Sequence, residues 1–245
     1  MFPRIIFSDF DGTLTHGSSL GSIFFDVLAA SKQLGAEFVI VTGRSLSWSH
    51  FLLTHTNLRA MISEGGGVLS IKQGEDEIFS DIPQVELEQI EALQEFVYKF
   101  KKYFTNLPLT ADSLGRLTDR AIDLHDLNDQ NMPLVMKYMQ EHEINFSCSS
   151  VHLNFWKGTM SKYKAMQDFL TAYRPGIAMD ECLFFGDSTN DQSVFEHMKH
   201  TVGVSNIKEF LPRMQHKPKM ILQGEENDGP SGVLNFLTDL RKSRK

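Results

Sequence analysis

The sequence predicts an α/β fold, with a parallel sheet that carries helices on both faces and an inserted α+β cap domain. Short apolar runs alternate with helical stretches over residues 1–79 and again over 158–245, which is the pattern of a parallel sheet. Between residues 80 and 157 this alternation stops, and a long amphipathic helix is followed by strand-like segments. We therefore expect residues 1–79 and 158–245 to form the core and residues 80–157 to form the cap.

The first part of the core is expected to hold three strands and two helices. The apolar run before Asp9 and the runs at 38–41 and 60–63 predict strands. A helix near residues 20–34 should stop at Gly35, since glycine is common at helix C-termini. Ser45 has the side chain of an N-cap residue and is expected to begin the second helix. Glu64 and the three glycines after it are expected to form a flexible turn into the cap.

In the cap, apolar residues recur at helical spacing from Leu87 to Phe104 and predict one long helix. Strands are expected at 121–124 and 151–156, with a helix between them near 134–139. The core pattern then resumes. A helix is expected over 161–173, strands near 183–185, 201–204 and 220–222, and a last helix through Val233 and Leu240.

Acidic residues follow two of the predicted core strands. Asp9 and Asp11 come directly after the first apolar run, and Asp187 and Asp191 follow the run at 183–185. In a parallel sheet, ligands bind at the carboxyl ends of the strands, so two such strands side by side would bring these acids together. Carboxylates that crowd one site repel one another unless a cation balances them. The sequence therefore predicts a site for one hard cation.

Composition narrows the classes of partner. The formal net charge of −7 argues against a nucleic-acid partner and against a polybasic membrane contact. No apolar run approaches the length of a membrane span, and the first strand begins too early for a cleavable signal peptide. We expect a cytoplasmic protein, a monomer or weak homodimer, whose partner is a small molecule.

With these motifs in place, the sequence resembles the haloacid dehalogenase-like superfamily of phosphohydrolases, whose four motifs are spread over a Rossmann-like core. The first motif resembles Asp9–Thr13, the second the strand that ends in Thr42, and the fourth the run 186–191. The third needs one lysine, for which Lys162 is the best match. Because the insert falls between the second and third motifs, the chain is similar to members with a type-two cap, in the subgroup of sucrose-phosphate, trehalose-phosphate and mannosyl-phosphoglycerate phosphatases.

The resemblance implies a Mg²⁺-dependent phosphatase that hydrolyses a small phosphate monoester, a sugar phosphate above all. Asp9 would be the nucleophile that forms an aspartyl-phosphate, and Asp11 would move protons. Mg²⁺ would be held by Asp9, by Asp187 and by the backbone carbonyl of Asp11, with Asp191 behind them. The phosphate would be bound by Thr42, Gly43, Lys162 and Asn190.

Several alternatives stay open at this point. Lys164 competes with Lys162, because residues two apart on a helix point about 200° apart and only one can face the site. A phosphomutase, similar to the protein-type phosphomannomutases, would use the same core, and a non-catalytic binding module is the third possibility. Substrate contacts are expected from a set of basic residues in the second motif and the cap: Arg44, Arg116, Arg120, His125 and His152. For Arg44, an ion pair with an acid is an equal alternative.

The family often has Glu-Asn-Gly after the third strand, whereas this chain has Glu64 followed by glycine. The missing amide side chain puts in doubt any substrate contact carried over to that position.

Overall fold

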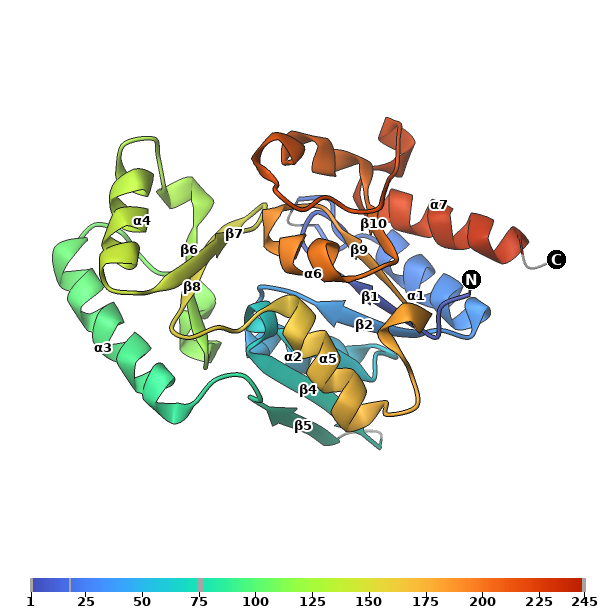
Figure 1. The fold of residues 1–245 in the computed structure, drawn as a ribbon, viewed down its shortest axis with the longest axis horizontal. Helices are drawn as coiled ribbons and strands as arrows, with labels where there is room; N and C mark the ends of the chain where they lie inside the picture. Colours follow the sequence, from blue (N-terminus) through green and yellow to red (C-terminus); the bar gives the residue numbers. More distant parts are fainter. Residues whose placement is uncertain (1, 18, 75–76, 244–245) are drawn as a thin grey trace.

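The computed structural model describes residues 2–17, 19–74 and 77–243. It contains two sheets: a large, mostly parallel sheet with helices on both faces, and a small antiparallel sheet beside it (Figure 1). The small sheet and its two helices lie at one end of the large sheet, on the left in this view. The predicted fold class, a parallel core with an inserted α+β cap, is therefore confirmed.

The large sheet has eight strands in the order β11-β10-β9-β1-β2-β3-β4-β5. The first six of these pair in parallel, whereas β3, β4 and β5 pair antiparallel. The strands are β1 (Ile5–Ser8), β2 (Glu37–Val41), β3 (Ala60–Ser63), β4 (Val68–Gln73), β5 (Glu77–Asp81), β9 (Cys182–Gly186), β10 (Thr201–Gly203) and β11 (Met220–Ile221). The position of β1 between β9 and β2 makes the two acidic motifs neighbours.

Helices cover the two faces of this sheet in separate apolar layers. Ile6 of β1 packs in the layer with α1 (Ile23–Leu34), α2 (Leu46–His55) and α7 (Gly229–Lys242). Ile5 and Phe7, which point the opposite way on the same strand, pack in the layer with α5 (Lys162–Tyr173) and α6 (Gln192–His197). Gly35 ends α1 with a left-handed φ of 76°, as expected for a glycine C-cap. The first strand is thus buried on both faces, which holds Asp9 at its end in a fixed place.

Strands β4 and β5 differ from the prediction. The glycines after Glu64 were expected to lead straight into the cap, but they form a short 3-10 turn and the chain then runs back as β4 beside β3. Val68, Leu69 and Ile71 are buried in this strand, and this apolar burial keeps the segment in the sheet. The predicted boundary at residues 79 and 80 falls inside β5.

The small sheet has the order β6-β8-β7, with β6 (Asp119–Asp123), β7 (Asn145–Cys148) and β8 (His152–Trp156). Its outer face packs on α3 (Leu87–Tyr103) and α4 (Asn131–Glu141) through an apolar cluster that includes Leu153 and Phe155 of β8. Side chains alternate along a strand, so Asn154 and Trp156 lie on the other face, toward the core.

Candidate active site

Three neighbouring strands end at the same edge of the large sheet. Asp9 follows β1, Asp187 follows β9, and Thr42 follows β2. The backbone N–H of Asp9 donates to the carbonyl of Phe185 at 2.9 Å, which ties the two acidic turns together. The sheet order thus gathers residues from three distant parts of the chain, as expected for the carboxyl edge of a parallel sheet.

Lys162 reaches this edge from the first turn of α5. Its Nζ lies 2.5 Å from Asp9 Oδ1 and 2.7 Å from Asp191 Oδ1, and its side chain is only 2% exposed. Lys164 pairs instead with Asp168 on the surface. Of the two lysines that the sequence offered, the structure places Lys162 in the site.

Asp9, Asp187 and Asp191 form a buried carboxylate cluster, in which one oxygen of each lies within 4.8 Å of the others. Burial raises the pKa of Asp9 to about 7, although the Lys162 ammonium acts in the opposite direction. Burial, reinforced by the carboxylates of Asp9 and Asp191, holds the pKa of Asp187 well above its ordinary value. Burial also lowers the pKa of Lys162, but the two carboxylates outweigh it and keep this ammonium charged.

This cluster fits a divalent cation. Three buried carboxylates face one ammonium, so two negative charges remain uncompensated in the ionised state. All three side chains offer hard oxygen ligands of the kind that Mg²⁺ prefers. The Asp11 carboxylate does not belong to the cluster, and its backbone carbonyl, the atom expected at the metal, stays a prediction. This carbonyl lies 3.4 Å from the Ser150 hydroxyl.

The Asp11 carboxylate faces Arg44. Arg44 donates from Nε to Asp11 Oδ2 at 2.8 Å and from Nη2 to Oδ1 at 2.5 Å, so both oxygens are engaged by one guanidinium. The guanidinium also lies over the Trp48 ring, 4.8 Å from its centre. Of the two roles expected for Arg44, the structure shows the ion pair with an acid, which is the second acid of the first motif, and substrate contact stays a prediction.

Close packing around Asp187 depends on Gly12 and Asn206. Gly12 has a φ of 78°, and a Cβ at this position would lie 2.2 Å from Asp187 Oδ2. Only glycine therefore fits at this turn. Asn206 donates from Nδ2 to the Gly12 carbonyl at 2.9 Å and to Asp187 Oδ2 at 3.3 Å. The sequence analysis missed Asn206, although its place just after the predicted strand at 201–204 was a usable signal.

The remaining candidates for phosphate binding lie on two loops beside the cluster. Thr42 is buried, and its hydroxyl accepts the backbone N–H of Arg44 at 3.0 Å. Asn190 accepts from the Ser188 hydroxyl at 2.9 Å through Oδ1, which leaves its amide N–H groups for another partner. Gly43 and Asn190 both line a cavity that Lys162 also borders.

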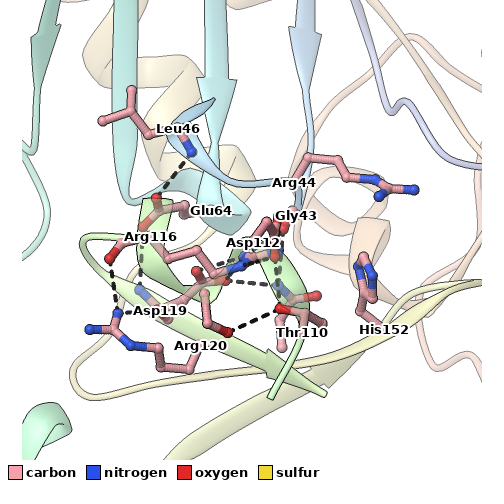
Figure 2. A network of polar contacts seen from close by, with 12 residues as sticks. Gly43, Arg44, Leu46, Glu64, Thr110, Asp112, Arg116, Asp119, Arg120 and His152 are labelled. Atoms are coloured by element: carbon pink, nitrogen blue, oxygen red, sulfur yellow. Dashed lines mark hydrogen bonds and ion pairs between the residues drawn. The ribbon is translucent and has the colours of Figure 1, made fainter. Parts of the chain in front are cut away.

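A buried polar network joins the cap to the Gly43 loop (Figure 2). Arg116 Nη1 and Asn154 Nδ2 each donate to the Gly43 carbonyl at 3.0 Å. Arg116 is fully engaged, because it also pairs with Asp119 at 2.8 Å and with Asp112 at 3.1 Å. Burial raises the pKa of Asp119 to about 7, although Arg116 beside it acts in the opposite direction. Arg116 therefore connects the cap to the core.

Glu64 makes a second connection from the core to the cap. Its carboxylate is buried and accepts the backbone N–H groups of Leu117 at 3.0 Å and Thr118 at 2.6 Å, together with the Thr118 hydroxyl at 2.8 Å. It also accepts the N–H of Leu46 at 3.2 Å, at the start of α2. The N-terminal N–H of α2 is thus capped by Glu64, and the predicted cap residue Ser45 makes no such bond.

The other basic candidates have local partners. Arg120 Nη1 donates to the backbone carbonyls of Arg116 and Asp119 at 3.1 and 2.6 Å. His125 is largely exposed and lies 3.5 Å from Asp126. His152 is buried 3.0 Å from Asp123, and burial together with Arg44 and Arg116 holds its pKa below the ordinary value.

Comparison with known proteins gives one family match. The model of the family described as haloacid dehalogenase-like hydrolase matches residues 6–113 and 121–237. No curated protein sequence is significantly similar to the chain. Among the described residues, none of the helices combines the length and apolar composition that a bilayer span requires.

Similar solved structures share the fold at low sequence identity. A protein of Thermoplasma acidophilum is 15% identical with a TM-score of 0.71, and the match covers 99% of both chains. A haloacid dehalogenase-like hydrolase from B. subtilis is 14% identical with a TM-score of 0.68, over 97% of this chain and 99% of that one. The sucrose-phosphatase of Synechocystis, solved with sucrose and phosphate, is 14% identical with a TM-score of 0.67, over 98% of both.

The raised pKa of Asp187 gives a prediction about metal and pH. In EDTA, Asp9 and Asp187 keep their protons in the folded protein at pH values where the unfolded chain has already released them, above about pH 4. The free energy of unfolding therefore falls as the pH rises from about 4 through the pKa values that these two residues have in the folded state. We expect urea denaturation to show a larger loss of stability between pH 4 and 8 in the wild type than in Asp187→Asn, because the variant removes one buried carboxyl with a raised pKa. Mg²⁺ should restore stability at pH 8 in the wild type and not in the variant. Equal pH profiles and no effect of Mg²⁺ would contradict the assigned cluster.

The contacts of Glu64 predict that Glu64→Gln loosens the attachment of the cap. The amide NH₂ of glutamine would face N–H donors, at a cost of about 1–3 kcal/mol. We expect lower stability in urea and faster hydrogen exchange at the amides of Leu117 and Thr118. The control is Glu91→Gln, on the exposed surface of α3. If both variants behave alike, Glu64 does not hold the cap.

Proposed function

The chain belongs to the haloacid dehalogenase-like hydrolases, and from this premise we propose that it is a Mg²⁺-dependent phosphatase that hydrolyses a small phosphate monoester. The observation that carries the proposal is the buried Asp9 carboxylate, held by Lys162 and placed beside two further carboxylates. A structural role does not account for three buried acids with one ammonium, because uncompensated buried charge is costly. A bound divalent cation would compensate this excess negative charge.

The residues that would hold Mg²⁺ are Asp9 and Asp187, with Asp191 behind them, where it orients Lys162 and the turn. Asp191 Oδ2 accepts the backbone N–H groups of Asp187 and Ser188 at 3.1 and 3.2 Å. These hydrogen bonds are consistent with a role in holding the turn that carries Asp187. When bound, the cation supplies positive charge that offsets the repulsion between the Asp9 carboxylate and an anionic phosphoryl group.

In the first step, an oxygen of Asp9 attacks phosphorus, a new O–P bond forms, and the bond from phosphorus to the leaving oxygen breaks. Lys162 and the amide of Asn190 are suited to bind the oxygens of the phosphoryl group, as are the backbone amides after Thr42. In the second step, water attacks the phosphorus of the aspartyl-phosphate and releases inorganic phosphate. Asp9 is thereby returned to its carboxylate form.

Asp11 would protonate the leaving oxygen in the first step and accept a proton from water in the second. In the structure, Arg44 engages both of its carboxylate oxygens. We infer that Arg44 orients Asp11 and must give up at least one of these hydrogen bonds before Asp11 can carry a proton. Arg44 is therefore assigned to positioning rather than to substrate contact.

We propose that the core, residues 1–79 and 158–245, carries out the reaction and that the cap, residues 80–157, selects the substrate. A sugar phosphate is the substrate class we propose. The similarity of fold to a phosphatase solved with sucrose and phosphate is consistent with this class. The cap closes over the carboxyl edge of the sheet, where it can exclude water.

The proposal is tested by phosphate release from phenyl phosphate and a panel of sugar phosphates. We expect turnover with Mg²⁺ and none in EDTA. Lys162→Met should lower kcat roughly 10²- to 10³-fold, because it removes a buried charge next to Asp9. Lys164→Met, two residues away on the exposed side of the same helix, is the matched control and should keep wild-type activity.

Two outcomes would contradict the proposal. Interconversion of hexose phosphates that depends on a bisphosphate, with little net phosphate release, would identify a phosphomutase. Bound Mg²⁺ without turnover across the whole panel would identify a binding module.

A further inference from the structure

Asn206 contacts one of the acids that the proposed function assigns to the metal. It lies in the 3-10 turn Ser205–Glu209 that follows β10, and its Nδ2 donates to Asp187 Oδ2 at 3.3 Å and to the Gly12 carbonyl at 2.9 Å. Its Oδ1 accepts the backbone N–H of Gly229, the first residue of α7, at 3.1 Å. One side chain is thus bonded to three segments that lie far apart in the sequence.

These three contacts fix the orientation of the Asn206 amide. An amide side chain has two N–H donors and one carbonyl acceptor, and at Asn206 both donors and the acceptor have a partner. A flipped amide would place its oxygen against the Gly12 carbonyl and Asp187 Oδ2, and its NH₂ against the N–H of Gly229. Each contact would then be repulsive, so Asn206 presents a donor to Asp187.

The two carboxylate oxygens of Asp187 have different surroundings. Oδ2 accepts from Asn206 and lies so close to Gly12 that a Cβ there would come within 2.2 Å of it. Oδ1 lies 3.4 Å from the Thr13 hydroxyl, which is long for a hydrogen bond between a hydroxyl and a carboxylate. The carboxylate is therefore held on its Oδ2 side, and Oδ1 is the oxygen left for a cation.

The number of oxygens that a carboxylate offers bears on the choice of metal. Mg²⁺ requires near-octahedral coordination, keeps several waters and takes few carboxylate oxygens, whereas Ca²⁺ accepts about 6–8 oxygens, including both from one carboxylate. Groups that hydrogen-bond a ligand from behind orient it and change the affinity for the metal. A carboxylate that is restrained to one free oxygen thus favours the smaller ion.

We propose that Asn206 is a positioning residue, which restrains Asp187 to coordination through one oxygen and so favours Mg²⁺ over Ca²⁺ at the acid cluster. The inference rests on the proposed metal-dependent function and deepens it with a residue outside the four sequence motifs. A purely structural role of Asn206, which would tie α7 to the turn at Gly12, makes a different prediction. Its loss would weaken the binding of both ions alike.

The test measures the binding of Mg²⁺ and of Ca²⁺ by titration calorimetry, so it does not depend on turnover. Asn206→Ala removes all the contacts of the amide. Asn206→Asp keeps an oxygen that can accept from Gly229 and removes the donors to Gly12 and Asp187. The added charge of the aspartate acts on both ions, and the readout is therefore the ratio of the Ca²⁺ Kd to the Mg²⁺ Kd.

Asn235→Ala is the matched control. Asn235 lies on the exposed side of α7, and its Nδ2 also donates to a backbone carbonyl, that of Glu226, at 2.9 Å. The control thus removes an amide of the same kind without touching the acid cluster. We expect the ratio of the two Kd values to fall roughly tenfold in both Asn206 variants and to keep its wild-type value in Asn235→Ala.

An unchanged or higher ratio in either Asn206 variant would overturn the inference, even if both Kd values rise. If Asn206→Ala does not fold, Asn206→Asp decides the test. The result is separate from that of the proposed function. Loss of Mg²⁺ selectivity in the variants, with no phosphate release by the wild type, would contradict the phosphatase proposal and leave the role of Asn206 standing. Phosphate release by the wild type with an unchanged ratio in the variants would do the reverse.

Discussion

The ion pairs of Lys162 with Asp9 and Asp191 are the interactions on which the candidate site depends. They place one ammonium among three carboxylates at the buried edge of the sheet, so the folded chain carries negative charge that it does not balance by itself. A cluster of this kind is stable only with protons or a cation in place. The cluster therefore costs stability by itself, and under the proposed function a divalent cation supplies the missing positive charge.

The cap is joined to this edge by buried polar contacts rather than by an apolar interface. Glu64 holds the backbone at the start of β6, and Arg116 holds the carbonyl of Gly43, next to Thr42. Breaking either contact leaves a buried polar group without a partner, so the closed arrangement is specific as well as stable. The same contacts pair the charged side chains of Arg116 and Asp119 with each other.

The α/β fold and the gathering of acids at the sheet edge could be predicted, because apolar periodicity and the geometry of parallel strands determine both. The pairing of charges could not. Arg44 and Arg116 were both candidate substrate contacts in the sequence, and only the packed structure shows which carboxylates engage them. Strand β5 was missed because its side chains alternate at an exposed edge, where burial gives a weak signal. Asn206 could have been predicted from its place just after the strand at 201–204, but its partners Gly12 and Asp187 could not, because they lie far away in the sequence.

Detection of a phosphoryl group on Asp9 tests directly whether this residue is the nucleophile. The wild-type protein is mixed with substrate and Mg²⁺, quenched in acid within milliseconds, and digested for mass spectrometry. We expect to find the phosphoryl group on the peptide that contains Asp9. We expect no phosphoryl group on this peptide when EDTA replaces Mg²⁺. A phosphoryl group on another residue, or hydrolysis at the wild-type rate by Asp9→Asn, would show that Asp9 is not the nucleophile.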